Sequence, residues 1–293
     1  MAKITIALVQ MEMQEGKEAN LAHALELISR AAKKGAQIVC LPELFTAPYF
    51  ANVAGGKGKA AADFAEAIPG KTTEALANAA KANGVVLVAG SIYESAGENH
   101  AAGKGNFFNT SCVFDADGKL LGKYRKMHVP QDESYFEKDY FADGDTGFVV
   151  FKTKFGKLAP LICYDQWFPE AARIAALQGA EIIFYPTAIG LVDGVEQSEG
   201  NWQEAWENVM RGHAIANGVV VAACNRAGKE GKMSFWGGSF VCDAFGKTLA
   251  RGKKEEEIVI AAIDTEHSNS VREGWRFFYN RRPESYSKIT EKK

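Results

Sequence analysis

Cys163 is the residue whose type and position most clearly suggest chemistry, that of a reactive thiol. This cysteine ends an apolar segment and is followed by a helical pattern that begins at Pro169. Free N–H groups and the helix dipole at such a position favour a thiolate and can bind an oxyanion. A small apolar core residue is the alternative interpretation, so the neighbouring side chains must decide between the two.

Glu43 and Lys126 are the candidates for those neighbours. Glu43 follows a short apolar segment, and a carboxylate at the end of a buried strand must be paired or must exchange protons, as a general base does. A glutamate that just emerges into solvent is the alternative interpretation. Lys126 lies in a basic segment that follows a strand-like alternation of apolar and polar residues. A lysine on a solvated, basic surface is therefore an alternative interpretation. His128 could form a Cys–His pair, but a structural histidine is the simpler interpretation.

The elements that must position these residues occur twice in the chain. Three pairs of similar segments follow each other in the same order: 35–42 and 179–186, 82–86 and 216–220, and 113–119 and 241–247. A glycine followed by a Val/Ile-rich segment predicts a left-handed helix cap and then a buried strand. The four such glycines are Gly35, Gly84, Gly179 and Gly218.

We therefore predict one α/β domain over residues 1–293, built from two similar halves at about 1–130 and 150–265. Each half would be a mixed sheet covered by helices, and the two sheets would stack face to face. Ligands bind beyond the carboxyl ends of the strands in such sheets. Glu43 and Thr187 stand at equivalent strand ends of the two halves, so we expect them at one rim together with the candidate cysteine.

The composition excludes several classes of function. The chain has 34 Lys and Arg against 36 Asp and Glu, mixed along its length, so no nucleic-acid partner is indicated. No apolar segment reaches about 18 residues, so no membrane span is predicted. The five cysteines are odd in number and widely spaced, which indicates a reducing compartment, and we expect a cytoplasmic location.

Three motifs together resemble the Glu-Lys-Cys signature of the nitrilase superfamily of carbon–nitrogen hydrolases. They are Leu41-Pro-Glu43-Leu, Tyr124-Arg-Lys126-Met-His and Leu161-Ile-Cys163-Tyr-Asp-Gln-Trp-Phe-Pro-Glu. The likeness runs along almost the whole chain, and its details are similar to the N-carbamoylputrescine amidases of that superfamily. The resemblance implies a four-layer α-β-β-α sandwich of two pseudo-symmetric halves, a homo-oligomer, and neither a metal nor an organic cofactor.

With this resemblance, each residue type has an expected role. Cys163 would be the nucleophile, and Glu43 would take its proton and then protonate the leaving amine. Lys126 and the backbone N–H of Tyr164 would stabilise the oxyanion. Glu137 resembles the second carboxylate of the family, which would hold the lysine charged and oriented, and an exposed glutamate in a charged segment is the alternative interpretation. Where the family lines its pocket, this chain has Tyr49, Gln131, Tyr135, Tyr164 and Thr187.

The expected reaction is hydrolysis of N-carbamoylputrescine to putrescine, ammonia and carbon dioxide through a carbamoyl-cysteine. Relatives that act on carbamoyl amino acids tend to have an arginine just after the nucleophile, whereas the only charge in segment 164–167 is acidic. The candidate partners for an ammonium tail are Asp165, Asp132, Glu133 and Asp193, with the aromatic faces of Tyr49, Tyr135 and Trp167. An ω-amidase, a ureido-acid hydrolase and a non-catalytic relative remain as alternatives.

The tail from about residue 268 combines aromatic residues with arginines, a composition typical of interfaces. We expect it to pack across a subunit interface through Trp275, Phe277, Phe278 and Tyr279. The expected partners are therefore a small carbamoyl amine and further copies of the chain, and neither nucleic acid nor a membrane.

Overall fold

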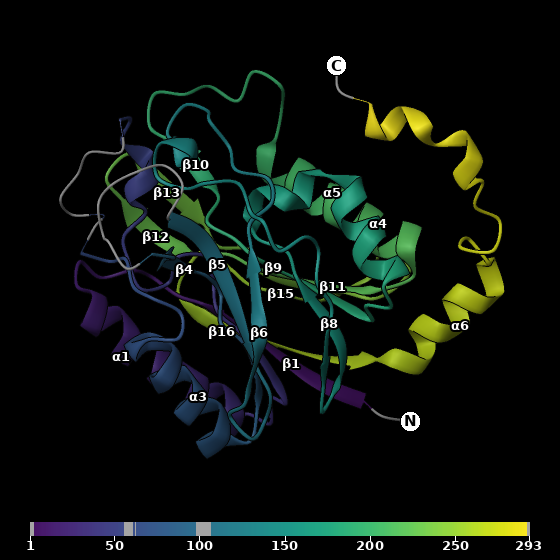
Figure 1. Ribbon diagram of the computed structural model, residues 1–293, viewed down its shortest axis with the longest axis horizontal. Helices are drawn as coiled ribbons and strands as arrows, with labels where there is room; N and C mark the ends of the chain where they lie inside the picture. Colours follow the sequence, from purple (N-terminus) through teal and green to yellow (C-terminus); the bar gives the residue numbers. More distant parts are fainter. Residues whose placement is uncertain (1–2, 56–60, 62, 98–106, 292–293) are drawn as a thin grey trace.

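The computed structural model of the protein describes residues 3–55, 61, 63–97 and 107–291. Two large β-sheets, a small third sheet and helices on the outer faces make up these residues (Figure 1). The α-helices are α1 (Lys17–Lys33), α3 (Lys71–Asn83), α4 (Pro169–Leu177), α5 (Trp202–Asn217) and α6 (Thr265–Trp275). The short 3-10 helices are η1 (Phe50–Asn52), η2 (Glu137–Asp139), η3 (Cys163–Trp167), η4 (Pro283–Ser285) and η5 (Ser287–Thr290).

The first sheet has the strand order β16-β1-β2-β3-β5-β4, and β6 pairs with β5. Its strands are β1 (Lys3–Gln10), β2 (Ile38–Cys40), β3 (Val86–Val88), β4 (Ile92–Ser95), β5 (Phe107–Phe114), β6 (Leu120–Arg125) and β16 (Glu257–Asp264). β16 runs antiparallel to β1 over its whole length, from Lys3 opposite Asp264 to Gln10 opposite Glu257. The prediction that residues 150–265 form their own sheet is therefore wrong for the last strand, which instead covers the edge of the first sheet.

The second sheet has the strand order β15-β14-β11-β9-β8-β7. Its strands are β7 (Phe151–Thr153), β8 (Gly156–Pro160), β9 (Ile182–Pro186), β11 (Val220–Cys224), β14 (Phe240–Cys242) and β15 (Thr248–Arg251). A third sheet, absent from the prediction, consists of β10 (Gly190–Val192), β13 (Met233–Trp236) and β12 (Ala227–Glu230). The repeated sequence segments form equivalent elements, since β2 and β3 are parallel neighbours in one sheet, as β9 and β11 are in the other.

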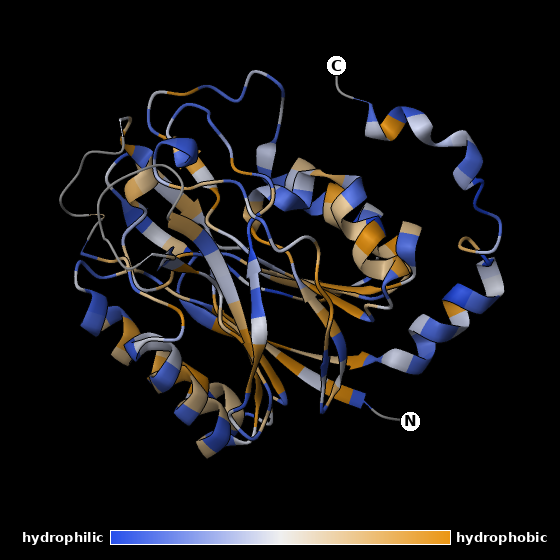
Figure 2. Ribbon diagram, in the orientation of Figure 1, coloured by the Kyte–Doolittle hydropathy of each residue, from blue (hydrophilic) through white to orange (hydrophobic). Residues whose placement is uncertain are grey.

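Three apolar layers separate the sheets and helices. Ile6 and Leu8 of β1 pack with Ile182 and Phe184 of β9 between the two sheets. The alternate residues of the same strands pack against α1 and α3 on one side and against α4 and α5 on the other. Figure 2 shows the strands as mainly hydrophobic ribbons and the helices as hydrophilic on their outer faces. The result is the four-layer α-β-β-α sandwich that was predicted.

Two glycines at helix ends set where the following strands begin. Gly84 after α3 and Gly218 after α5 adopt left-handed conformations, with φ of 63° and 59°. Such a conformation is strained for residues with a side chain, so a glycine ends each helix sharply. β3 and β11 begin two residues later, as the sequence pattern predicted.

The C-terminal segment leaves the sandwich as an extended arm that begins at α6 (Figure 1). The side chain of Asp264 caps α6 by accepting hydrogen bonds from the backbone N–H groups of Glu266 and His267. Trp275 is 56% exposed and Tyr279 is 65% exposed. The predicted subunit interface along this arm stays a prediction. Within the described ranges, no helix has the length and apolar character needed to cross a membrane.

Candidate active site

Strand ends from both sheets bring the predicted catalytic side chains together. Glu43 lies in the turn after β2, Lys126 directly follows β6, and Cys163 begins η3 a few residues after β8. The Nζ atom of Lys126 lies 2.8 Å from Oε1 of Glu43. The charges of Glu43 and Lys126 both act on the thiol of Cys163. All three side chains are buried, so the three segments form one site between the halves.

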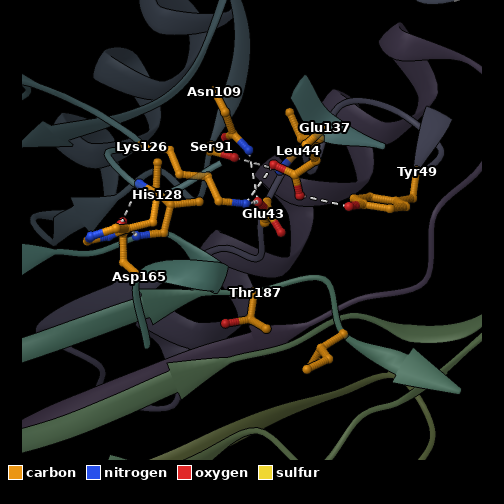
Figure 3. A network of polar contacts seen from close by, with 12 residues as sticks. Glu43, Leu44, Tyr49, Ser91, Asn109, Lys126, His128, Glu137, Asp165 and Thr187 are labelled. Atoms are coloured by element: carbon orange, nitrogen blue, oxygen red, sulfur yellow. Dashed lines mark hydrogen bonds and ion pairs between the residues drawn. The ribbon is translucent and has the colours of Figure 1, made fainter. Parts of the chain in front are cut away.

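Lys126 is held between two carboxylates (Figure 3). Its ammonium donates to Glu43 Oε1 at 2.8 Å and to Glu137 Oε2 at 2.7 Å. Each carboxylate has one further donor: the Tyr49 hydroxyl lies 2.7 Å from Glu137 Oε1, and Asn109 Nδ2 lies 2.8 Å from Glu43 Oε1. Glu43 Oε2 has no hydrogen-bond partner within the described part of the chain. One oxygen of this carboxylate is therefore open to accept a proton.

The buried trio of Glu43, Lys126 and Glu137 combines two acidic groups with one basic group. Burial acts to lower the pKa of Lys126, but the charges of Glu137 and Glu43 raise it overall, so the ammonium stays protonated. Burial raises the pKa of Glu137 to about 7, with repulsion from Glu43 in the same direction and attraction to Lys126 opposing it. The buried position of Glu137 therefore moves the titration of its carboxyl from the acidic range toward neutral pH.

Cys163 has a positive backbone φ of 42°, which is uncommon outside glycine and is typical of functionally constrained residues. Burial raises the pKa of its thiol well above the usual value; the charge of Glu43 adds to this and Lys126 opposes it. The expectation that a helix N-terminus favours a resting thiolate is therefore wrong. The helix here is the single 3-10 turn η3, and the thiol needs a base at the moment of attack.

Asp165 holds the backbone just before Cys163 and the backbone just after Lys126. Its carboxylate accepts the backbone N–H groups of Ile162 at 2.8 Å and His128 at 3.1 Å, and it lies 2.7 Å from the Tyr124 hydroxyl and from His128 Nδ1. These partners fill both oxygens, so the prediction that Asp165 could bind a substrate ammonium is wrong. The His128 ring also stacks on Phe168 at 3.7 Å between centroids, in agreement with a structural histidine.

A cavity of about 510 Å³ reaches Cys163. Tyr135 and Tyr164, two of the five predicted pocket residues, line it. The uncharged remainder of the lining is Pro130, Trp167, Ile189, Gly190, Val192, Val195, Ser198, Trp202 and Ala205. A small substrate with an aliphatic chain can therefore reach the sulfur along a mainly apolar and aromatic surface.

Four carboxylates line the same cavity: Asp132, Glu133, Glu196 and Glu199. The described lining residues include no lysine, arginine or histidine. The first two carboxylates were predicted, whereas Asp193 instead pairs with Lys229 at 2.8 Å. Glu196 and Glu199 were missed because the loop between β10 and α5 has no periodic pattern that would place it. The charge of the cavity favours a cationic group on the substrate.

The other three predicted pocket residues are not among those that line this cavity. Tyr49 supports Glu137, and the Gln131 amide donates to Asp139 at 3.2 Å. Thr187 directly follows β9, where its buried hydroxyl lies 3.1 Å from the side-chain oxygen of Gln166. Sequence reasoning also missed Asn109, although a polar residue inside the apolar strand β5 was a signal that it has a buried partner.

Comparisons with known proteins agree with this geometry. Residues 5–273 match the family model described as carbon-nitrogen hydrolase. The chain is 40% identical over 294 residues to N-carbamoylputrescine amidase from Solanum lycopersicum, covering 97% of this chain and 93% of the relative. It is 36% identical to a citrullinase from Francisella tularensis, with 100% of both chains covered.

A solved structure gives the same result for the fold. The crystal structure of a carbon-nitrogen hydrolase from Helicobacter pylori G27 superposes with a TM-score of 0.90 at 37% identity, covering 99% of each chain. The family match spans most of the chain and includes the segments that carry the buried trio and the cysteine. The chain therefore belongs to the carbon-nitrogen hydrolase family of the nitrilase superfamily.

Proposed function

We propose that this amidohydrolase converts N-carbamoylputrescine to putrescine, ammonia and carbon dioxide. The observation that carries the proposal is the cavity at Cys163, where four carboxylates and no described basic residue form the charged part of the lining. The substrate has a urea-like carbamoyl group at one end and an ammonium at the other. The carbamoyl group would lie at the sulfur, and the ammonium would lie among the carboxylates. The 40% identity to the Solanum lycopersicum enzyme supports this substrate.

In the proposed first half-reaction, the Cys163 sulfur attacks the carbamoyl carbon while its proton passes to the open oxygen of Glu43. The carbonyl oxygen becomes an oxyanion, which the Lys126 ammonium and the backbone N–H of Tyr164 stabilise. The carbon–nitrogen bond then breaks, and Glu43 returns the proton to the departing nitrogen. Putrescine leaves, and a carbamoyl group remains on the sulfur.

In the second half-reaction, a water molecule attacks the carbamoyl carbon while Glu43 takes one of its protons. The carbon–sulfur bond breaks, and the sulfur recovers the proton from Glu43. The released carbamic acid decomposes to ammonia and carbon dioxide. Glu137 takes part in no bond change in this scheme. Its carboxylate, 2.7 Å from Lys126, keeps the ammonium charged and oriented.

A ureido-acid hydrolase is the alternative that one observation favours, since the citrullinase relative covers the whole chain. Citrulline carries a carboxylate beside its ammonium, and that carboxylate would face the acidic cavity lining. An ω-amide that ends in a carboxylate would meet the same repulsion. A non-catalytic relative would have no need for the buried trio beside a thiol that lines a cavity. These arguments favour a carbamoyl amine.

Ureas that share the carbamoyl group and differ at the far end test the substrate. Ammonia release is measured for N-carbamoylputrescine, butylurea, 4-ureidobutyrate and citrulline, with Cys163→Ser as the inactive control. We expect kcat/KM for N-carbamoylputrescine to exceed that for butylurea by about 10- to 100-fold, because one hydrogen-bonded charge pair is lost in butylurea. Faster turnover of either acid would contradict the substrate while leaving the carbon–nitrogen hydrolase chemistry intact.

Neutral variants of the cavity carboxylates test their contact with the ammonium. Glu196→Gln and Glu199→Gln should each raise KM for N-carbamoylputrescine by about 3- to 10-fold and leave the turnover of butylurea unchanged. The measurements are made at low salt, since exposed charges are screened. Glu204→Gln on α5, which does not line the cavity, is the matched control. An equal effect on both ureas would contradict a direct contact with the ammonium.

We also propose that the chain is a single-domain homo-oligomer of the cytoplasm that serves polyamine biosynthesis. The exposed aromatic residues of the C-terminal arm support an assembly through that arm. The five cysteines are free and buried, which supports a reducing compartment. Putrescine is itself a polyamine, so the proposed reaction would supply that class of compound.

A further inference from the structure

We propose that Arg226 and Glu230 are positioning residues for Glu43 and Glu137, the two carboxylates that hold Lys126, an inference that rests on the proposed role of Glu43. Arg226 lies between β11 and β12, directly before β12, and Glu230 ends β12. The Arg226 side chain is 0% exposed, and its Nη1 atom donates to Glu230 Oε1 at 2.8 Å. Burying a guanidinium costs free energy unless all of its N–H donors have partners. The partners of the remaining donors of Arg226 therefore indicate its role.

Those contacts gather the backbone of the turn that carries Glu43. Nε and Nη2 of Arg226 donate to the Glu43 carbonyl at 3.1 and 2.9 Å. Nη2 also donates to the carbonyls of Leu44 at 2.7 Å and Ala47 at 3.0 Å. Leu44 has a φ of 48°, and its N–H is fixed by Ser91 Oγ at 2.8 Å. The backbone of this turn is strained at Leu44. The planar guanidinium of Arg226 holds the turn by donating hydrogen bonds to three of its carbonyl groups.

Glu230 extends the same support to the second carboxylate of the trio. Its Oε2 atom accepts the backbone N–H of Tyr49 at 2.6 Å. The hydroxyl of Tyr49 in turn donates to Glu137 at 2.7 Å, as Figure 3 shows. The Arg226–Glu230 pair therefore acts on Glu43 through its backbone and on Glu137 through Tyr49. The pair comes from the second half of the chain, Glu43 comes from the first, and Glu137 comes from the segment between them, so the pair joins the halves at the site.

The expected consequence is an effect on turnover rather than on substrate binding. A shift of about 1 Å between the base and the sulfur can lower the rate by about 100-fold. Neither Arg226 nor Glu230 lines the cavity at Cys163, so KM should change little. A purely structural role would instead lower the stability of the protein and leave the kcat of its folded fraction unchanged.

Arg226→Lys is the test variant, because it keeps a buried positive charge beside Glu230 but loses the fork that spans three carbonyls. Arg251→Lys is the matched control. Arg251 on β15 also holds a glutamate, with Nε and Nη2 at 3.0 and 2.6 Å from Glu207 Oε1, outside the site. Folded fractions of both variants are compared with the wild type in kcat, KM and the pH profile of Cys163 alkylation by iodoacetamide.

We expect Arg226→Lys to lower kcat by about 10- to 100-fold with KM changed less than about 3-fold. We also expect it to change the pH profile of Cys163 alkylation, since both the base and the negative charge that raises the pKa of the thiol are displaced. Glu230→Gln should act in the same direction through Tyr49, and it replaces the first variant if that variant does not fold. The control Arg251→Lys should match the wild type in every measurement.

Wild-type kcat and a wild-type alkylation profile in folded Arg226→Lys would overturn the inference. Failure of both Arg226→Lys and Glu230→Gln to fold would also reject it, because the pair would then determine the fold and not the site. Alkylation needs no substrate, so an error in the substrate proposal is recognised separately. In that case the wild type does not turn over N-carbamoylputrescine, while the difference in alkylation persists.

Discussion

Among the individual residues, the central feature is one buried ammonium between two buried carboxylates. Lys126 uses two of its three N–H donors on Glu43 and Glu137, and in the proposed mechanism the third meets the oxyanion. Glu43 keeps one oxygen without a described partner, and in the proposed mechanism this oxygen takes the proton. Burial raises the pKa of the Cys163 thiol, so the proton has to leave as the sulfur attacks.

Removing the ammonium tests this arrangement. Lys126→Met leaves two buried carboxylates without their shared cation, so we expect a loss of about 3–5 kcal/mol in the free energy of unfolding. We also expect kcat to fall by at least about 100-fold, because an oxyanion donor is lost. Denaturant unfolding and ammonia release measure the two effects. Adding Glu137→Gln should recover part of the stability and none of the activity; recovered turnover would contradict the role of Lys126.

The raised pKa of Glu137 makes stability depend on pH. Its value of about 7 in the folded protein lies above the ordinary value of 4.5, so folding favours the protonated carboxyl. That contribution is complete below pH 4.5 and is lost as the pH rises through about 7. Glu137→Gln cannot titrate. We therefore expect the melting temperature of the wild type relative to Glu137→Gln to fall between about pH 5 and pH 8. A constant difference would mean that Glu137 keeps one charge state throughout.

Among the elements, the strand ends decide where the chemistry lies. β2, β6 and β8 each end just before a residue of the proposed catalytic set, and β11 ends just before Arg226. The helices that cover the sheets set where the strands begin, since Gly84 and Gly218 end α3 and α5 in left-handed conformations. A substitution at one of these glycines therefore disturbs the start of the following strand. The other end of that strand leads toward the site.

Two glycine substitutions test the cap at α3. Gly84→Ala should lower the free energy of unfolding by about 1–2 kcal/mol, because the residue must keep its φ of 63°. No atom lies within 4 Å of the added Cβ, so the cost comes from the backbone alone. Gly212→Ala, inside α5 and equally unobstructed, should raise the free energy by about 0.5–1 kcal/mol. Urea unfolding distinguishes them; equal effects would contradict the left-handed cap.

In the molecule as a whole, the two halves are joined in three ways. The apolar layer between the sheets takes side chains from both, β16 of the second half completes the first sheet, and the Arg226–Glu230 pair holds the turn of Glu43. The arm from α6 is the part that extends beyond the sandwich (Figure 1). Its Trp275 ring stacks on Phe277 at 5.8 Å between centroids, yet both remain partly exposed.

Polar substitutions on the arm test its proposed place at a subunit interface. We expect the wild type to have a solution mass that is a multiple of the chain mass by light scattering. Trp275→Ser combined with Tyr279→Ser should shift this mass toward that of one chain, because large aromatic residues carry much of an interface energy. Both side chains are exposed in the single chain, so its folding should be preserved. A monomeric wild type would contradict the proposal.

The sequence by itself determined much of the local structure and the candidates for the reactive groups. The glycine-strand repeats predicted which segments form equivalent strands, because burial patterns and left-handed caps are local properties. Glu43, Lys126 and Cys163 were recognised by their motifs, and the layered α/β fold followed from the repeat and the resemblance. Their common rim was predictable since strand ends of such sheets meet at one edge.

The tertiary structure decided everything that depends on contacts between distant segments. Only the packed chain places β16 beside β1, fills both oxygens of Asp165, and brings Arg226 to carbonyls about 180 residues away in sequence. The protonation of the thiol also depends on contacts between distant segments. The position of Cys163 beside a helix suggested a thiolate, but burial and the charge of Glu43 raise the pKa of Cys163. Neither solvation nor the distance between charges is encoded in a local pattern, so both emerge only when the chain is folded.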